Sequence, residues 1–445
     1  MSRLRRSLRI LPFLVLALPA VSGGSVRRVP SQYATINAAI DAAASGDSVL
    51  VAPGVYDQYE TRLLGDGYWY SSVVFLRGEV SIVSEGGAAS TTLRMDSASQ
   101  TPVVLRAYGE SGTATVDGFT VTGSVAGIRG LSFTWGDHCV IRDCVFRDLG
   151  TGGSGQIAVG GTGSDLEVHG CHFENINGAT GSAIHQTSGT LLLENSEFTN
   201  CRSGAIQLTY DSGFPHITWA TIRRCRFSNN TGVGGSVGTY AYSTVLIEDC
   251  WFERNRSGPG GGALGLSGPD VTIRNNTFVG NSVASGLGGA VDLQLGTVLL
   301  EGNTFYGNFI DEVSGRGGSA VYLHSGVNCT FRRNVVAAST GGQAVGVYGA
   351  SIQPSCDLYW DNAQGNTAGF VPDATDLIAD PMFCDTTASD LDVNAASPCL
   401  PGNGNPSCTE LIGAWGQGCG TVAVEPSSWG RIKNSFRSGS EEAGR

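Results

Sequence analysis

The stretches VLIEDCWF (residues 245–252), VTIRNNTF (271–278) and VLLEGNTF (298–305) share one pattern: alternating aliphatic residues, then Cys or Asn, one further residue and Phe. Related copies recur about every 25–31 residues between Ile141 and Val336. Alternation with a period of two is typical of β-strands, whose side chains point to opposite faces in turn. A unit this short cannot bury a core alone, so the copies must stack on one another as in solenoid proteins.

A second phrase lies between the copies, as in GALGL (262–266) and GAVDL (289–293). Small residues followed by an aliphatic residue fit a tight corner that leads into a second short strand. Two strands and glycine-rich corners per repeat predict one turn of a parallel β-coil, with like residues stacked on like. The 65 glycines of the chain fall at these corners, which favours ordered structure over disorder.

The two ends of the coil differ from its repeats. Ile36, Ala39, Ile40 and Ala43 follow a helical period, so we expect an amphipathic helix at about residues 33–44 that caps the first coil. The coil with this cap is predicted to span residues 23–355. A Cys-rich C-terminal cap is expected at 356–420, followed by a flexible tail at 421–445.

Residues 1–22 read as a secretory signal peptide, with four arginines before a short apolar run and small residues near Ser22. Its removal changes the formal charge from −12 to about −16, and so acidic a chain repels nucleic acid. We find no stretch that is long and apolar enough to form a transmembrane segment. The expected location is secreted, extracellular or at the cell surface, or else the periplasm, and we expect a monomer.

The 12 cysteines fall into two groups. Cys144 and Cys171, like Cys225 and Cys250, are predicted on adjacent coils with parallel Cβ directions, which favours buried free thiols. Cys-x-x-Cys and other zinc spacings are lacking, so neither a metal site nor a cofactor is expected. The C-terminal region is predicted to form two disulfides, whose pairing the sequence leaves open, among these residues: Cys384, Cys399, Cys408 and Cys419.

The segment from Gln32 to Tyr56, with its Ala-rich helix and VLVAPGVY, resembles the start of right-handed parallel β-helix proteins of the pectin lyase-like superfamily. The GGA and Phe-x-x-Asn phrases are similar to the repeats of polymorphic outer membrane proteins of bacterial surfaces. The resemblance covers roughly residues 30–350. It implies an all-β, right-handed, single-stranded parallel β-helix, but it says little about activity, because that superfamily holds both enzymes and non-catalytic adhesins.

Outward positions of the second phrase form a candidate carbohydrate-binding surface, in which polar and aromatic groups rise one coil at a time, about 4.8 Å apart. A solvated sheet face is the competing interpretation. We call this set the stripe: His185, Gln207, Tyr240, Asp292, Gln294, Tyr322, His324 and Tyr348.

Three functions remain open. The leading hypothesis is non-catalytic recognition of a polysaccharide or another surface polymer along the stripe. Asp292 is the single carboxylate of the stripe, whereas glycoside hydrolysis uses two, so no catalytic pair is evident. The alternative is a polysaccharide lyase or glycoside hydrolase centred on Asp292 and His324, which a neighbouring coil brings together. The third is a structural cell-surface spacer or adhesin.

Overall fold

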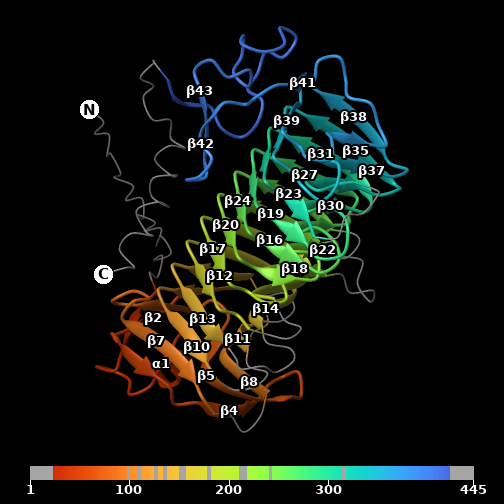
Figure 1. Cartoon of the computed structure of the whole chain (residues 1–445). Coiled ribbons are helices and arrows are strands. Elements are labelled where there is room, and N and C mark those ends of the chain that lie inside the picture. The colour runs from red at the N-terminus through yellow and green to blue at the C-terminus, as the bar shows by residue number, and fades with distance from the viewer. Residues whose placement is uncertain are drawn as a thin grey trace, which may run out of the picture.

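The computed structural model describes residues 24–97, 101–108, 112–124, 129–133, 138–149, 157–177, 182–209, 218–239, 243–311 and 317–420. The predicted signal peptide (1–22) and tail (421–445) lie outside the described residues. The chain winds into a rod of stacked coils, with the N-terminal coils at one end and the last coils at the other (Figure 1). All strand pairs of the coils are parallel in the described part, apart from one hairpin at the N-terminal end.

Each coil contributes strands to three successive faces. We call the strands of the first face the first run and those of the second face the second run. These two faces are continuous because two long strands bend from one to the other. The first run consists of β5 (Trp69–Arg77), β8 (Thr101–Tyr108), β11 (Arg129–Ser132), β14 (Ile157–His169), β16 (Ile184–Glu194), β18 (Ile206–Thr209), β22 (Val237–Thr239), β26 (Leu264–Leu266), β30 (Val291–Leu293), β34 (Val321–Leu323), β37 (Val345–Val347) and β40 (Thr367–Ala368), with β4 (Glu60–Leu63) antiparallel to β5.

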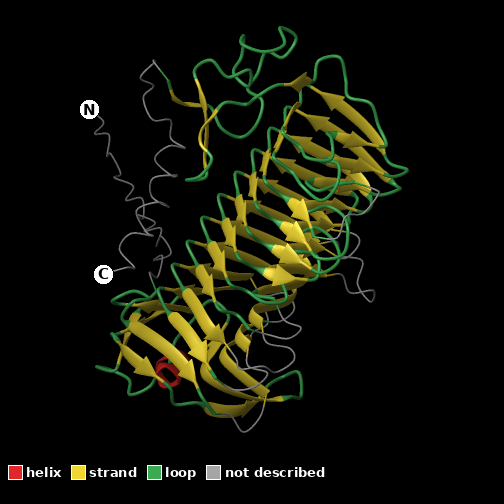
Figure 2. Ribbon diagram, viewed as in Figure 1, coloured by secondary structure: helices red, strands yellow, loops and turns green. Residues whose placement is uncertain are grey.

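The second run lies beside the first run along the rod (Figure 2), and the two runs join at β14 and β16, which pass from one to the other. It consists of the C-terminal halves of β14 and β16 together with β1 (Val26–Val29), β2 (Ser48–Val51), β6 (Ser81–Ser84), β9 (Thr113–Asp117), β12 (His138–Arg142), β19 (Thr218–Arg223), β23 (Ser243–Glu248), β27 (Asp270–Arg274), β31 (Gly296–Glu301), β35 (Val327–Arg332) and β38 (Ser351–Ser355).

The third face is a separate sheet, which we call the phenylalanine sheet. It consists of β3 (Gly54–Tyr56), β7 (Thr91–Met95), β10 (Thr120–Gly123), β13 (Val145–Leu149), β15 (His172–Glu174), β17 (Glu197–Thr199), β20 (Arg226–Ser228), β24 (Trp251–Glu253), β28 (Thr277–Val279), β32 (Thr304–Tyr306), β36 (Val335–Ala337), β39 (Leu358–Trp360) and β41 (Leu377–Ile378). Four two-residue strands form a small further sheet: β21 (Thr231–Gly232), β25 (Arg256–Ser257), β29 (Ser282–Val283) and β33 (Phe309–Ile310).

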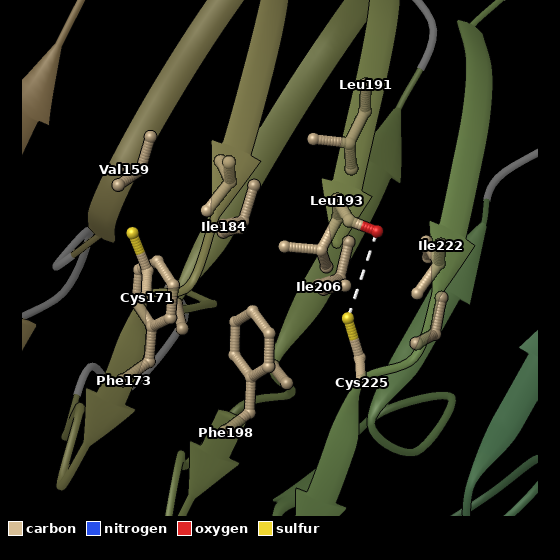
Figure 3. Packing of buried hydrophobic residues seen from close by; sticks show 14 of the residues in the cluster. Val159, Cys171, Phe173, Ile184, Leu191, Leu193, Phe198, Ile206, Ile222 and Cys225 are labelled. Carbon is tan, nitrogen blue, oxygen red and sulfur yellow. Dashed lines mark hydrogen bonds between the residues drawn. The ribbon is translucent and has the colours of Figure 1, made fainter. Parts of the chain in front are cut away.

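The core consists of inward columns in which like residues stack, as the sequence predicts. Phe173 pairs in register with Phe198, and Leu193 pairs with Ile222, all of them buried (Figure 3). The phenylalanine column is a continuous stack with ring centroids 4.5–5.0 Å apart and interplanar angles of 1–9°. Its members are Phe146, Phe173, Phe198, Phe227, Phe252, Phe278 and Phe305. Stacking of this kind adds to the burial of each ring, so this column stabilises the register of the coils.

Two buried polar columns flank the phenylalanines at the corners. In one, Asn255 Oδ1 accepts hydrogen bonds from the backbone N–H and the side-chain amide of Asn230, both at 3.0 Å, and Asn255 in turn donates to Asn281. In the other, the cysteines predicted to be thiols are free and buried, and the Cys225 thiol donates to the Leu193 carbonyl at 3.8 Å (Figure 3). Each of these asparagines thus satisfies a corner amide of the adjacent coil, and each of these thiols donates to a carbonyl of the preceding coil.

The predicted N-terminal helix exists but is shorter than expected. Helix α1 spans Ile36–Asp41, because Thr35 caps its N-terminus by accepting a hydrogen bond from the Ala38 amide and Ala42 ends it. Its buried residues include Ile36 and Ile40. Asn37 fixes the helix to β5, since its side chain bonds both Val73 and Phe75. The helix lies at the N-terminal end of the rod (Figure 2), in the position expected for a cap.

Two disulfides form near the C-terminus, but one prediction about them was wrong. Cys384 pairs with Cys419, both from the predicted set, whereas Cys408 pairs with Cys356. Cys399 is a free thiol, fully buried in the core of the cap, where the sequence analysis expected a disulfide. Cys356 takes its place: it occupies the corner position that Arg333 holds one coil earlier and lies half-buried against the core of the cap.

The coil continues past residue 355, where the sequence analysis placed its end. Strand β39 pairs with β36, so that Val336 is followed in its column by Tyr359, and β41 pairs with β39. The fading aliphatic pattern hid these strands. The cap strands β42 (Phe383–Asp385), β43 (Asp390–Asn394) and β44 (Gln417–Cys419) form their own small sheet beside the rod (Figure 1).

The cap packs against the outer face of the phenylalanine sheet. Val393, Cys399 and Ile412 share a small hydrophobic core with Val335 and Leu358 of that sheet. Beyond this core the chain runs back along the rod, where the Trp415 indole donates to the Thr277 hydroxyl at 2.7 Å and meets Trp251 edge-on. The C-terminal segment therefore fastens several coils together along their side.

Candidate functional site

The stripe residues of the first run do form columns. His185, Gln207, Asp292 and Tyr322 stand in one register column, through Gly238 and Gly265. Gln294, His324 and Tyr348 lie two positions further along their strands or just beyond them. Tyr240 lies outside the described residues.

The middle of the stripe is covered, contrary to the expectation of an exposed surface. Asp292 is only 2% exposed and Tyr322 only 1%. The glycine-rich corners cause this, because the chain before each strand folds back over the outer face of the first run. A Cβ on Gly265 would lie 2.8 Å from the Gly234 Cα, so only glycine allows so close an approach of two backbones.

The predicted contact between Asp292 and His324 is present. Asp292 Oδ1 lies 2.7 Å from His324 Nε2, and the Gln294 amide donates to the other carboxylate oxygen at 3.3 Å. The Tyr322 ring meets the imidazole edge-on at 4.7 Å. Gln294 is exposed, and so are Tyr348, at 58%, and part of His324, at 37% side-chain exposure. A buried carboxylate that orients a half-exposed imidazole is the one feature of the stripe capable of acid–base chemistry.

At the other end of the stripe, the His185 side chain is already hydrogen-bonded within the protein. Its Nε2 lies 3.0 Å from the Thr209 hydroxyl, which also bonds Thr187 at 2.7 Å. Burial lowers the pKa of His185, and the positive charge of Arg129 lowers it further. The imidazole is therefore neutral at neutral pH and serves in a hydrogen-bonded structural cluster.

A hollow that the sequence did not predict, which we call the groove, lies on the outer face of the second run. Its volume is about 330 Å³, and it crosses β12, β14, β16 and β19. The residues that line it are His138, Asp165, Leu166, Glu167, Thr190, Leu191, Leu192, Trp219 and Thr221. The register places His138, Asp165, Thr190 and Trp219 in one outward column on four successive coils.

A bridge of alternating acid and imidazole groups runs along one side of the groove. Glu167 Oε1 lies 3.0 Å from His138 Nε2, and its other oxygen lies 3.1 Å from His169 Nε2. The hydrogen bond with His169 lowers the pKa of Glu167, and His138 acts in the same direction. Glu167 is therefore an ionised acceptor at neutral pH and does not carry a proton to donate.

Two arginines next to the groove, Arg223 and Arg224, are already paired. Burial alone would raise the pKa of Glu194, but Arg223 and Arg224 lower it through direct ion pairs. The lining of the groove itself contains no Lys or Arg. Asp165 accepts a 2.5 Å hydrogen bond from the Thr190 hydroxyl and is otherwise open to solvent on the described surface. The groove thus presents carboxylates without a compensating guanidinium or ammonium group.

Trp219 is 48% exposed, which is unusual for so large an apolar side chain. Its column neighbours are Thr190 and Thr244, whose short side chains leave room beside the indole. An exposed indole beside carboxylates and hydroxyls can pack on the apolar face of a sugar ring while polar groups bind its hydroxyls.

The described residues contain no group of three or more His, Cys, Asp or Glu arranged to hold a metal ion. They also contain no helix with the length and hydrophobicity needed to cross a lipid bilayer.

Comparisons with known proteins agree with the fold. Residues 105–278 match the family model of the right handed beta helix region, and no curated protein matches the sequence. Similar solved structures include a rhamnogalacturonan lyase (13% identity, 81% of this chain and 91% of that chain, TM-score 0.41) and the pectate lyase Pel9A (14%, 90% and 98%, 0.42). A third is a family 28 exopolygalacturonase of Yersinia enterocolitica (10%, 77% and 78%, 0.35). With identities and TM-scores this low, none of these likenesses bears on what this chain binds.

Proposed function

Since the chain is a right-handed parallel β-helix, as its resemblance to pectin lyase-like proteins implied, we propose that it is an exported, non-catalytic protein that recognises a polysaccharide. We place the recognition in the groove and not along the stripe. The two disulfides support export, because such cross-links persist in oxidising compartments.

One observation carries this proposal: the exposed Trp219 stands in a groove together with Asp165 and Glu167. Sugar-binding sites need an apolar platform and a few well-placed acceptors, and the groove supplies both. The stripe supplies neither in its middle, because backbone covers Gly265 and Asp292 is buried.

The protonation state of Glu167 supports binding over glycoside hydrolysis in the groove. Glycoside hydrolysis requires one carboxyl group that holds its proton until the leaving group departs, which means a raised pKa. The pKa of Glu167 is lowered instead, because it accepts hydrogen bonds from two imidazoles. This residue is suited to binding hydroxyl groups and not to protonating a glycosidic oxygen.

The test is calorimetric titration of the protein with a panel of oligosaccharides, followed by Trp219→Ala. Loss of a stacked indole should weaken binding about tenfold or more. Trp360→Ala is the matched control, since Trp360 is 40% exposed but lies on the phenylalanine sheet. Equal affinities of the Trp219 and Trp360 variants would remove the groove as the site. A panel without any ligand would refute recognition and favour a structural spacer.

A second candidate function rests on the 2.7 Å contact between Asp292 and His324. If this pair acts as a general base, the protein should cut a polysaccharide. Release of reducing ends or unsaturated ends that disappears with Asp292→Asn, but persists with Trp219→Ala, would establish the enzyme.

A further inference from the structure

We propose that the groove selects uncharged polysaccharides and rejects polyuronates, an inference that rests on the proposed function of the groove. The reason lies in the charge of its lining. Asp165 and Glu167 are carboxylates two residues apart on the same face of β14. A uronate ring that packs on Trp219 would bring its own carboxylate toward both.

Two nearby arginines are not free to offset this repulsion. Arg223 and Arg224 lie nearby, but both are engaged by Glu194. The two imidazoles next to the groove, His138 and His169, share Glu167 between them. The whole chain is also acidic, with a formal charge of −12, so the long-range field repels a polyanion as well.

An uncharged sugar meets the opposite situation. Its hydroxyl groups are donors, and hydrogen bonds to an ionised carboxylate are stronger than those between neutral groups. Asp165 keeps acceptor capacity, because a carboxylate has about four lone-pair sites and the Thr190 hydroxyl uses one of them. Thr221 adds a hydroxyl group that can accept or donate, and the Thr190 hydroxyl, which donates to Asp165, can still accept.

Matched ligand pairs test this charge discrimination. The probes are oligomers of glucan, mannan and galactan, each compared with the same oligomer oxidised at C6 to the uronate. At least one uncharged oligomer should bind. The affinity of its uronate counterpart should be lower by a factor of about ten or more, as expected for like charges a few ångströms apart at a protein surface. Raising the salt concentration should reduce the ratio of the uncharged oligomer's affinity to the uronate's affinity, because salt screens the repulsion.

Asp165→Asn should also reduce this affinity ratio, since it removes one negative charge from the groove and keeps the shape of the side chain. Asp270→Asn is the matched control. Asp270 is exposed in the same outward column of the second run, four coils from Asp165, and its substitution changes the net charge equally. It should leave the ratio unchanged.

The outcomes separate the two proposals. Tight binding of a uronate that depends on Trp219 would overturn the selectivity and leave recognition in the groove intact. An equal effect of Asp165→Asn and Asp270→Asn would also overturn it, because the discrimination would then come from net charge alone. Absence of binding by every probe would overturn both proposals.

Discussion

Asn255→Ala should destabilise the middle of the rod far more than an ordinary polar substitution. Asn255 is fully buried, and its Oδ1 is the acceptor for two buried donors, the backbone N–H and the side-chain amide of Asn230. Alanine leaves both donors without that acceptor. At about 1–3 kcal/mol for each buried unsatisfied group, the expected loss is about 2–6 kcal/mol.

Chemical denaturation followed by circular dichroism gives the overall loss, and hydrogen exchange of the Asn230 amide shows whether the loss is local. Local opening is expected, because each coil of a solenoid contacts only its neighbours. Asn255→Ser should recover part of the stability, since Ser196 in the parallel polar column accepts the Cys171 N–H at 3.1 Å. The exposed Asn328→Ala is the control, with an effect within about 0.5 kcal/mol. A loss below about 1 kcal/mol in Asn255→Ala would refute the role assigned to these columns.

Three further perturbations test the C-terminal half. Asp357 ends the other polar column, and burial raises its pKa. Between the unfolded and folded pKa values, Asp357 keeps its proton in the folded protein but loses it in the unfolded chain. Its contribution to stability is therefore full below the unfolded pKa and falls as pH rises through the folded pKa. Asp357→Asn keeps an acceptor for the Asn334 amide, and its melting temperature should exceed that of the unchanged protein at neutral pH but not in acid. Cys408→Ser should cost the cap about 4 kcal/mol by the chain-entropy estimate for residues 52 apart, measured as protease sensitivity beyond Cys356. Trp415→Ala should lower unfolding free energy by about 1–3 kcal/mol and speed hydrogen exchange in β28.

The inward columns could be predicted from the sequence because stacking makes equivalent residues neighbours. Phe227 and Phe252 are 25 positions apart in the chain, yet their rings stack at 4.7 Å, and the same holds along the whole column. A residue that must fill the same space on every coil is repeated in kind. The repeat therefore discloses which face of each strand is buried.

The covering of the stripe could not be predicted in this way. Gly234 and Gly265 are separate features of the sequence, and only the path of the corner brings one backbone onto the other. Two glycines at stripe positions, Gly238 and Gly265, were the available signal, because a strand position without a side chain permits a second backbone to lie on it. The disulfide partner Cys356 was missed for a related reason, since its outward direction depends on a coil that the aliphatic pattern no longer marked.

The groove illustrates why function on a solenoid resists prediction from its repeat. Outward columns are free to vary from coil to coil, and the groove exists because one column combines a large residue, Trp219, with the short Thr190 and Thr244 on either side. Another outward column of the second run contains Glu194 and Arg223 and shows no such contrast of side-chain size. Along it, acidic and basic residues alternate from coil to coil and form ion pairs. Paired charges hold adjacent coils in register, whereas the exposed half of the Trp219 side chain buries no surface in the coil. A feature that the fold does not need is the one most economically explained by a ligand.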